Sequence, residues 1–267
     1  MSEPLYTSWR AGTNLRRRSV LLLGGAALTA SLGETFSAAP LHGHGIRAVA
    51  FDAFAIFDSR SVVAACESAF PGRGSILSKE WRARQFEYQW LTALAGRYQD
   101  FWETTRNALE FAARSTNLAL SENTLNALMQ TYMHMTAWPD AAAALDALRR
   151  SGRKTLLLSN ATEAILHSSL TSSGLHRSFD HVLSTDRIAT YKPDPRAYQM
   201  AIDRTGYSKQ EILFVAFAGW DAAGARWFGY PTFWNNRLSS VAEELGVLPH
   251  FEAASLDALA TLPDLGR

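Results

Sequence analysis

The chain has 267 residues, of which 47% are hydrophobic and 19% are charged. This composition is typical of a globular protein and excludes a disordered, collagen-like or coiled-coil chain. The 26 basic residues almost balance the 25 acidic residues, and the resulting net charge of +1 argues against nucleic-acid binding as the main function. The single cysteine, Cys66, excludes a disulfide framework, and the scattered histidines form no helical metal-binding pair.

The first forty residues have the features of an export signal. Arginines at positions 16–18 precede an apolar stretch, residues 20–32. This stretch has about thirteen residues, fewer than the roughly 20 that cross a bilayer, so we expect no stable membrane anchor. Residues 17–21, Arg-Arg-Ser-Val-Leu, resemble the bacterial twin-arginine signal. We therefore expect residues 1–39 to direct the protein to the periplasm.

Short apolar runs and helical patterns alternate along the rest of the chain. Residues 46–51 form a nearly continuous apolar run, which predicts a buried parallel strand. Three further runs have the same character: residues 154–159, 212–216 and 232–234. The helical patterns between them are residues 141–150, 163–173 and 221–228. This alternation predicts an α/β fold of the Rossmann-like kind, with a parallel sheet and right-handed crossovers.

Residues 62–135 interrupt the alternation. They are helical in pattern, rich in aromatic residues and free of any strand-like run. We interpret this stretch as an all-helical subdomain inserted after the first strand. The predicted organisation is therefore a signal at residues 1–39, an α/β core at residues 40–60 and 137–267, and a helical cap at residues 61–136.

Chemically active side chains follow the predicted strands. Asp52 comes directly after the first strand, Ser159 and Asn160 end the second, and Asp221 lies just beyond the third. Lys192 lies on a loop before another predicted helix. Because ligands of an open parallel sheet bind at the carboxyl ends of its strands, these residues are candidates for one shared site.

An aspartate at a strand end can attack an electrophilic carbon and form an ester that water later cleaves. A nearby lysine would keep that aspartate ionised, and a second carboxylate would orient or deprotonate the water. Each residue alone also fits a structural role, such as a helix cap or a turn. Their combination at successive strand ends favours catalysis.

Several segments resemble the motifs of the haloacid dehalogenase superfamily. The segments that match its four motifs are residues 51–58 (Phe-Asp-Ala-Phe-Ala-Ile-Phe-Asp), 158–160 (Leu-Ser-Asn), 191–194 (Tyr-Lys-Pro-Asp) and 220–224 (Trp-Asp-Ala-Ala-Gly). Within the insert, residues 69–74, 81–82, 87–88 and 96–98 resemble the helical cap of its 2-haloacid dehalogenase branch. The resemblance covers about residues 46–251, and it implies a Rossmann-like parallel sheet with an inserted helical cap.

The resemblance also implies a role for each matching residue. The catalytic residues would be Asp52 as nucleophile, Lys192 as its cationic partner and Asp221, which supports the lysine and the water step together with Tyr198. The residues that would bind substrate are Arg82, Asn160 and Phe101 around the departing halide, Ser159 at the carboxylate, Tyr198 beside the lysine, and Phe54 and Trp220 as pocket walls. A homodimer is implied as well.

Magnesium-dependent phosphatases of this superfamily need a second aspartate two residues after the nucleophile. That position is Phe54, which cannot bind a cation. Phe217 and Ala218 also stand where a further carboxylate would precede Asp221. We therefore expect metal-independent chemistry and no cofactor.

The chain departs from the family pattern close to the nucleophile. Residues 55–56 (Ala-Ile) replace a glycine and a threonine, and Ala216 and Ala218 replace a serine and an asparagine. Residues 161–162 (Ala-Thr) also replace the usual Gly-Ser. Each hydrogen bond lost to a charged group costs roughly 1.5–3 kcal/mol and raises the pKa of a carboxylate.

Three functions fit this pattern. The first is an (S)-2-haloacid dehalogenase-like hydrolase, which releases halide from C2 of a small carboxylic acid and leaves a 2-hydroxy acid. The retained Arg82, Phe101 and Asn160 favour it. The second is an exported L-azetidine-2-carboxylate hydrolase, which opens a strained ring to give 2-hydroxy-4-aminobutyrate and whose cationic substrate suits a site with fewer neutral donors. The third is a carboxylate-binding protein with a decayed catalytic site.

Overall fold

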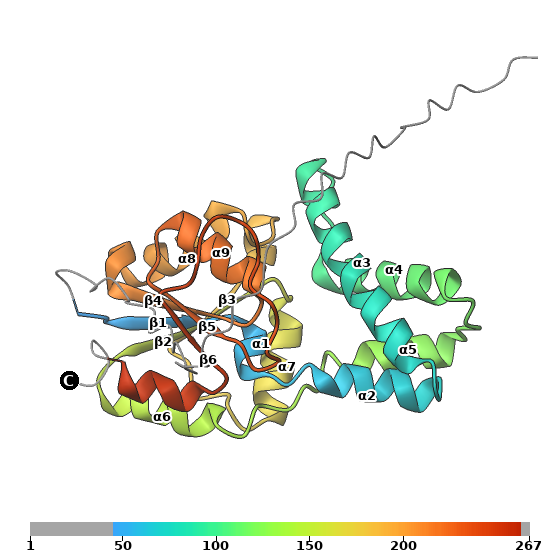
Figure 1. Ribbon diagram of the computed structural model, residues 1–267, viewed down its shortest axis with the longest axis horizontal. Coiled ribbons are helices and arrows are strands. Elements are labelled where there is room, and N and C mark those ends of the chain that lie inside the picture. Colours follow the sequence, from blue (N-terminus) through green and yellow to red (C-terminus); the bar gives the residue numbers. More distant parts are fainter. Residues whose placement is uncertain (1–44, 263–267) are drawn as a thin grey trace, which may run out of the picture. The chain divides into compact units, whose positions relative to one another are not determined.

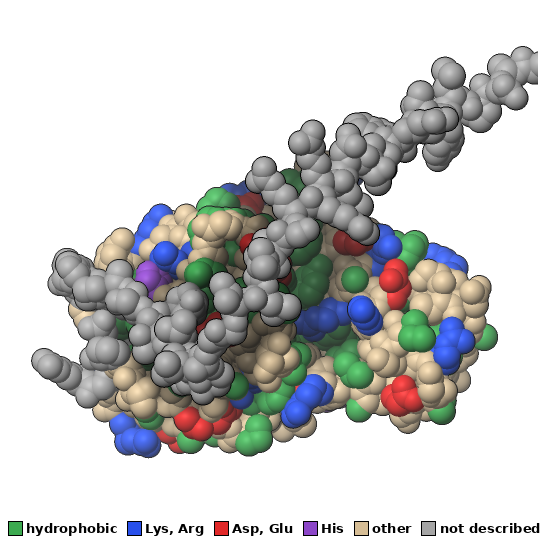
Figure 2. Space-filling model, viewed as in Figure 1, with side chains coloured by type: hydrophobic (Ala, Val, Ile, Leu, Met, Phe, Trp, Pro, Cys, Tyr) green, Lys and Arg blue, Asp and Glu red, His purple; other side chains and the backbone are tan. Residues whose placement is uncertain are grey.

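The computed structural model describes residues 45–262. The predicted export signal, residues 1–39, lies outside the described residues. Among the helices of residues 45–262, none is both long and apolar enough to cross a membrane. Acidic and basic side chains are mixed over the face seen in Figure 2, in keeping with the balanced net charge.

The described core is built on a six-stranded parallel sheet with the strand order β3-β2-β1-β4-β5-β6 (Figure 1). Its strands are β1 (Ala48–Phe51), β2 (Lys154–Ser159), β3 (His181–Ser184), β4 (Ile212–Ala216), β5 (Thr232–Asn235) and β6 (Phe251–Ala253). Ala48 of β1 pairs with Lys154 on one side and Ile212 on the other. The strand order reverses its direction at β1 and β4, and such a switch point opens a crevice at the carboxyl ends of the strands.

Helices cover both faces of the sheet (Figure 1). Helices α6 (Ala141–Arg150) and α7 (Glu163–Ser172) pack on one face, and α8 (Pro195–Thr205) and α9 (Gly219–Phe228) pack on the other. Val49 and Phe51 of β1 belong to the first apolar cluster, whereas Ala48 and Ala50 belong to the second. Alternate residues of a strand point to opposite faces, which explains why the whole of β1 is apolar and buried.

The segment between β1 and β2 carries the predicted helical insert, and residues 62–135 contain helices and loops but no strand. It contains the short α1 (Ala53–Ile56), followed by α2 (Arg60–Ala69), α3 (Gly74–Leu94), α4 (Phe101–Ser115) and α5 (Glu122–Gln130). Buried Trp81 of α3 donates a hydrogen bond from Nε1 to the Thr105 carbonyl of α4 (2.8 Å). Trp81 shares one buried apolar cluster with Phe51 of the sheet. The exact boundaries between core and cap remain predictions.

Two strands, β3 and β6, were not predicted from the sequence. The edge strand β6 has three residues, none of them fully buried, and β3 begins with two half-buried residues, His181 and Val182. Neither strand has the continuous apolar run that identifies an inner strand. The four predicted strands are present: β2 and β4 have the predicted ends, whereas β1 begins two residues later and β5 ends one residue later than predicted.

Candidate active site

The carboxylate of Asp52 is held at the carboxyl end of the central strand β1. Its Oδ1 accepts a hydrogen bond from Lys192 Nζ (2.8 Å), and its Oδ2 accepts one from the backbone N–H of Phe54 (3.0 Å). The second bond makes Asp52 the N-terminal cap of α1. Capping and ion pairing therefore act on the same side chain, and together they fix the orientation of a buried carboxylate.

Lys192 links two carboxylates in the interior. Its Nζ lies 2.8 Å from Asp52 Oδ1 and 2.6 Å from Asp221 Oδ2, and the residue is 1% exposed. Burial alone would lower the pKa of Lys192, but the two neighbouring carboxylates raise it above its ordinary value. The side chain therefore stays a cation and balances the charge of Asp52.

Asp221 lies behind the lysine, in the first turn of α9. Burial raises the pKa of its carboxyl to about 6, assisted by the charge of Asp52 and opposed by Lys192 and Tyr198. Its Oδ1 accepts a hydrogen bond from the Tyr198 hydroxyl (2.7 Å). Burial and the adjacent Asp221 also raise the pKa of Tyr198, so this phenol remains a hydrogen-bond donor.

A small hollow of about 20 Å³, which we call the inner cavity, lies against Asp52. Its volume is close to the space that one water molecule requires. Its walls are Asp52, Phe54, Arg82, Phe86, Gln89, Phe101, Ser159, Asn160, Phe217, Ala218 and Trp220. Of the predicted site residues, all line this cavity except Lys192, Asp221 and Tyr198, which form a hydrogen-bonded chain behind Asp52.

Arg82 brings an unpaired positive charge to the inner cavity from α3. Its guanidinium carbon lies 5.0 Å from the ring centre of Phe54 and 5.2 Å from that of Phe86. It forms no ion pair with any residue of the described part of the chain. Burial lowers the pKa of Arg82 and the charge of Asp52 opposes this, but a guanidinium remains charged in proteins. An anion is therefore the natural ligand for this wall of the cavity.

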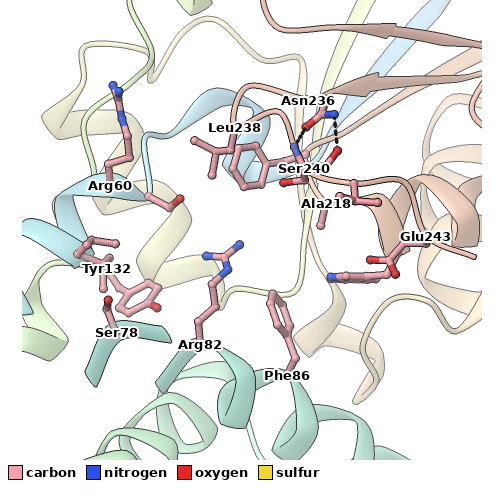
Figure 3. Close-up of a pocket in the computed structure, with 17 residues that line it drawn as sticks. Arg60, Ser78, Arg82, Phe86, Tyr132, Ala218, Asn236, Leu238, Ser240 and Glu243 are labelled. Atoms are coloured by element: carbon pink, nitrogen blue, oxygen red, sulfur yellow. Dashed lines mark hydrogen bonds between the residues drawn. The ribbon is translucent and has the colours of Figure 1, made fainter. Parts of the chain in front are cut away.

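A larger hollow of about 310 Å³, the outer chamber, adjoins the inner cavity (Figure 3). Arg82 points from α3 into this space in the close-up. The residues that line both hollows are Arg82, Phe86, Phe217, Ala218 and Trp220. The exposed Val241 and Glu243 line the outer chamber, so this chamber connects solvent to the wall of the inner cavity.

Sequence reasoning did not mention Phe86 and Gln89, two side chains that α3 contributes to the inner cavity. Both lie on the same face of α3 as Arg82, at spacings of four and seven residues. This spacing places side chains one above another on a helix, so it could have pointed to them. The structure also shows which departures face the nucleophile: Ala218 lines the cavity, whereas Ala216 packs in the second apolar cluster.

The loop after β2 is tied to both the cap and the lysine loop. Asn160 accepts a hydrogen bond at Oδ1 from the backbone N–H of Lys192 (2.9 Å), and it donates from Nδ2 to Gln89 Oε1 (3.3 Å). Ser159 Oγ accepts a hydrogen bond from the Ala161 N–H (3.1 Å), which leaves its own proton free to donate. This loop therefore presents a hydroxyl donor beside Asp52.

No cluster of three or more His, Cys, Asp or Glu side chains suited to a metal ion occurs within residues 45–262. The position two residues after Asp52, which carries an aspartate in the magnesium-dependent phosphatases, holds the ring of Phe54 against Arg82. The prediction of metal-independent chemistry rests on this residue.

A buried aspartate–lysine pair at the carboxyl end of a central parallel strand suits an enzyme of the α/β class that uses a carboxylate in its chemistry. A family model described as "haloacid dehalogenase-like hydrolase" matches residues 29–229, more than half of the chain. The chain belongs to this family, and it is a hydrolase.

Individual relatives agree with this assignment. The chain is 41% identical over 218 residues to the (S)-2-haloacid dehalogenase of Pseudomonas sp. (strain YL), covering 81% of this chain and 94% of the relative. It is 38% identical over 218 residues to haloacetate dehalogenase H-2 of Moraxella sp. (strain B), covering 81% and 97%. The L-2-haloacid dehalogenase of Xanthobacter autotrophicus, solved with chloropropionic acid covalently bound, superposes with a TM-score of 0.76 at 35% identity, covering 81% and 98%. The predicted fold class and family are confirmed.

Proposed function

We propose that the protein is an (S)-2-haloacid dehalogenase, which converts a short 2-halo acid and water into a 2-hydroxy acid, a halide ion and a proton. One observation carries the proposal: the inner cavity places the Asp52 carboxylate and the unpaired Arg82 cation around one small space. A nucleophile on one side and an anion-binding group on the other suit a displacement that expels a halide. The names of the relatives at 41% and 38% identity support the same chemistry.

In the first step, an oxygen of Asp52 attacks C2 of the substrate. The new bond joins this oxygen to C2, the carbon–halogen bond breaks, and its electron pair leaves with the halide. The Phe54 N–H and Lys192 hold Asp52 in place for the attack. The fixed orientation of the nucleophile reduces the entropy that the reaction must lose.

In the second step, water attacks the carbonyl carbon of the Asp52 ester. The acyl–oxygen bond breaks, so the product carries away an oxygen that belonged to Asp52. Lys192 Nζ contacts both carboxylates and can relay one proton of the water to Asp221, which later releases it to solvent. The other proton goes to the departing oxygen, which leaves as the hydroxyl group of the 2-hydroxy acid. A pKa of about 6 makes Asp221 a suitable proton acceptor near neutral pH.

The substrate carboxylate needs donors of its own. Ser159 lines the inner cavity and retains a free hydroxyl proton, because its oxygen accepts from Ala161. Phe101 and Trp220 complete the apolar walls that surround a short carbon chain. These contacts favour a small 2-substituted acid over a bulky substrate.

The test is proton NMR and halide release with the purified protein and (S)-2-chloropropionate, beside an Asp52→Asn control. We expect lactate and chloride in equal amounts from the wild-type protein and neither from the control. Chloride release that survives Asp52→Asn would contradict the proposed role of Asp52, and no release by the wild type would contradict the proposed function.

The same incubation separates the two other functions. With L-azetidine-2-carboxylate, we expect no 2-hydroxy-4-aminobutyrate, which would identify a ring-opening hydrolase instead. A protein that binds short carboxylates but turns over neither compound would be a binding protein with a decayed site.

We also propose that residues 1–39 export the protein to the periplasm. Support comes from the arginine pair at positions 17–18 followed by a short apolar stretch. Replacing both arginines by lysine should retain the protein in the cytoplasm, as measured by cell fractionation in a bacterial host. Unchanged periplasmic recovery of the variant would refute the twin-arginine route.

A further inference from the structure

Gln89 is a buried amide whose donor group has no partner in the described structure. The residue is 0% exposed, lies on α3 and lines the inner cavity together with Asp52 and Arg82. Its Oε1 accepts a hydrogen bond from Asn160 Nδ2 (3.3 Å). Its Nε2 has no hydrogen-bond partner among the described residues. Because buried donors are nearly always paired, this one calls for a ligand.

The hydrogen-bond network decides which end of the Gln89 amide faces the cavity. The backbone N–H of Lys192 can only donate, and it donates to one end of the Asn160 amide, which must be Oδ1 (2.9 Å). The other end of Asn160 is therefore Nδ2, which also can only donate. Gln89 must turn its oxygen toward this donor, so its Nε2 remains free.

The ligand for this donor must be a hydrogen-bond acceptor that fits a small space. The inner cavity measures about 20 Å³, and Arg82 supplies a second donor that has no carboxylate partner in the described part of the chain. The acceptor oxygens of Asp52 are already bonded to Lys192 and Phe54. Two free donors and a space of this size suit a monatomic anion.

The geometry points to Gln89 as a halide-binding residue whose Nε2 donates to the departing halogen, an assignment that rests on the proposed dehalogenase function. As Asp52 bonds to C2, the carbon–halogen electron pair moves onto the halogen. The N–H group becomes a stronger partner as that charge grows, and it gives up no proton. A hydrogen bond that strengthens during the reaction lowers the barrier and raises kcat.

Gln89→Met removes the donor and keeps a side chain of similar length. Chloride is a poorer leaving group than bromide, so the chloro substrate depends more on this hydrogen bond. We expect kcat/KM to fall about tenfold or more with (S)-2-chloropropionate and clearly less with (S)-2-bromopropionate. Inhibition by added chloride should weaken about tenfold as well. Gln89→Leu serves as a second variant with the same expected pattern.

Gln85→Met is the matched control. Gln85 lies one turn earlier on α3, is 1% exposed, and donates from Nε2 to Thr105 Oγ1 (2.5 Å). It does not line the inner cavity. Its loss should lower the melting temperature without changing the chloride-to-bromide ratio of kcat/KM or the inhibition by chloride.

Equal losses with both substrates and unchanged chloride inhibition in Gln89→Met would overturn the halide assignment, because a packing or carboxylate-binding role predicts that pattern. A wild-type protein that releases no halide from either substrate would instead overturn the proposed function. The two failures are distinguishable because the first leaves wild-type turnover intact.

Discussion

The two sides of the inner cavity differ in how their polar groups are satisfied. On the sheet side, Asp52, Lys192, Asp221 and Tyr198 form a continuous hydrogen-bonded chain in which each charge has a partner. On the α3 side, the Arg82 guanidinium contacts aromatic rings and forms no ion pair with described residues. The charges on the sheet side are thus paired before substrate binds. On the α3 side, the charge of Arg82 remains available for a ligand.

This difference suggests that the sheet side carries out the attack and the α3 side binds the leaving group. A carboxylate fixed by two donors is prepared for attack and needs no rearrangement. An unpaired cation gains most when an anion appears beside it, and a displacement reaction creates that anion. Substitutions on the sheet side should therefore impair both folding and chemistry, while those on the α3 side should act mainly on the leaving group.

The largest effect is expected from Lys192→Met. This change leaves the buried Asp52 and Asp221 carboxylates without their common cation, and breaking a buried pair costs about 3–5 kcal/mol. We expect a clear loss of melting temperature and a fall in kcat/KM on the order of 10³-fold. A variant with wild-type stability would show that the ion pairs contribute little to the fold.

Arg82→Leu should have a smaller effect, confined to activity. The arginine has no described ion pair to lose, so calorimetry should find the melting temperature nearly unchanged. Loss of one charge-assisted contact to the halide should lower kcat/KM about 10- to 100-fold. If the variant unfolded as readily as Lys192→Met, the contrast between the two sides of the cavity would be wrong.

The pH dependence of activity should follow the titration of Asp221, which lies on the sheet side of the inner cavity. Burial raises the pKa of Asp221 to about 6, so this carboxylate takes up a proton as the pH falls through that value. The proton removes the acceptor for the water step, which follows halide release, so kcat should fall about tenfold for each further pH unit. In Asp221→Asn, activity should be low and this acid limb absent. An unchanged acid limb in the variant would assign it to another group.

The smallest effect is expected from Gly224→Ala in α9. A Cβ at this position would lie 2.7 Å from Pro193 Cβ and closer still to the Tyr198 hydroxyl. The crowding should cost about 1–3 kcal/mol and shift Tyr198 away from Asp221. Chemical denaturation should detect the loss of stability, and the acid limb of the pH profile should move. A variant as stable as the wild type would mean that Tyr198 can move at no cost.

The sequence predicts the sheet side of the site better than the α3 side. Asp52 and Ser159 each directly follow or end a buried apolar run, so the rule for parallel sheets places them at one edge. Lys192 comes to the same place only through the loop before α8, and its contacts with both carboxylates depend on tertiary packing. The resemblance to the family supplies that assignment, and the geometry agrees with it.

On the α3 side, the family resemblance points to Arg82, but the sequence does not point to Gln89, for a physical reason. Gln89 looks like an ordinary surface residue of a polar helix, and its burial depends on the loop of Asn160 packing over it. The outer chamber is built from α2, α3, residues 217–220 and the segment after β5, so its two halves come from distant parts of the sequence. The sequence also does not reveal β3 and β6, the two edge strands, because both are short and only partly buried and each pairs with a single neighbouring strand.

The central claim is that Asp52 forms a covalent ester with the substrate. A single turnover in H₂¹⁸O, with enzyme in excess over (S)-2-chloropropionate, tests it most directly. The account predicts unlabelled lactate and one ¹⁸O atom in the peptide that contains Asp52, as measured by mass spectrometry. Labelled lactate with an unlabelled Asp52 peptide would show that water attacks C2 directly, and it would contradict the account.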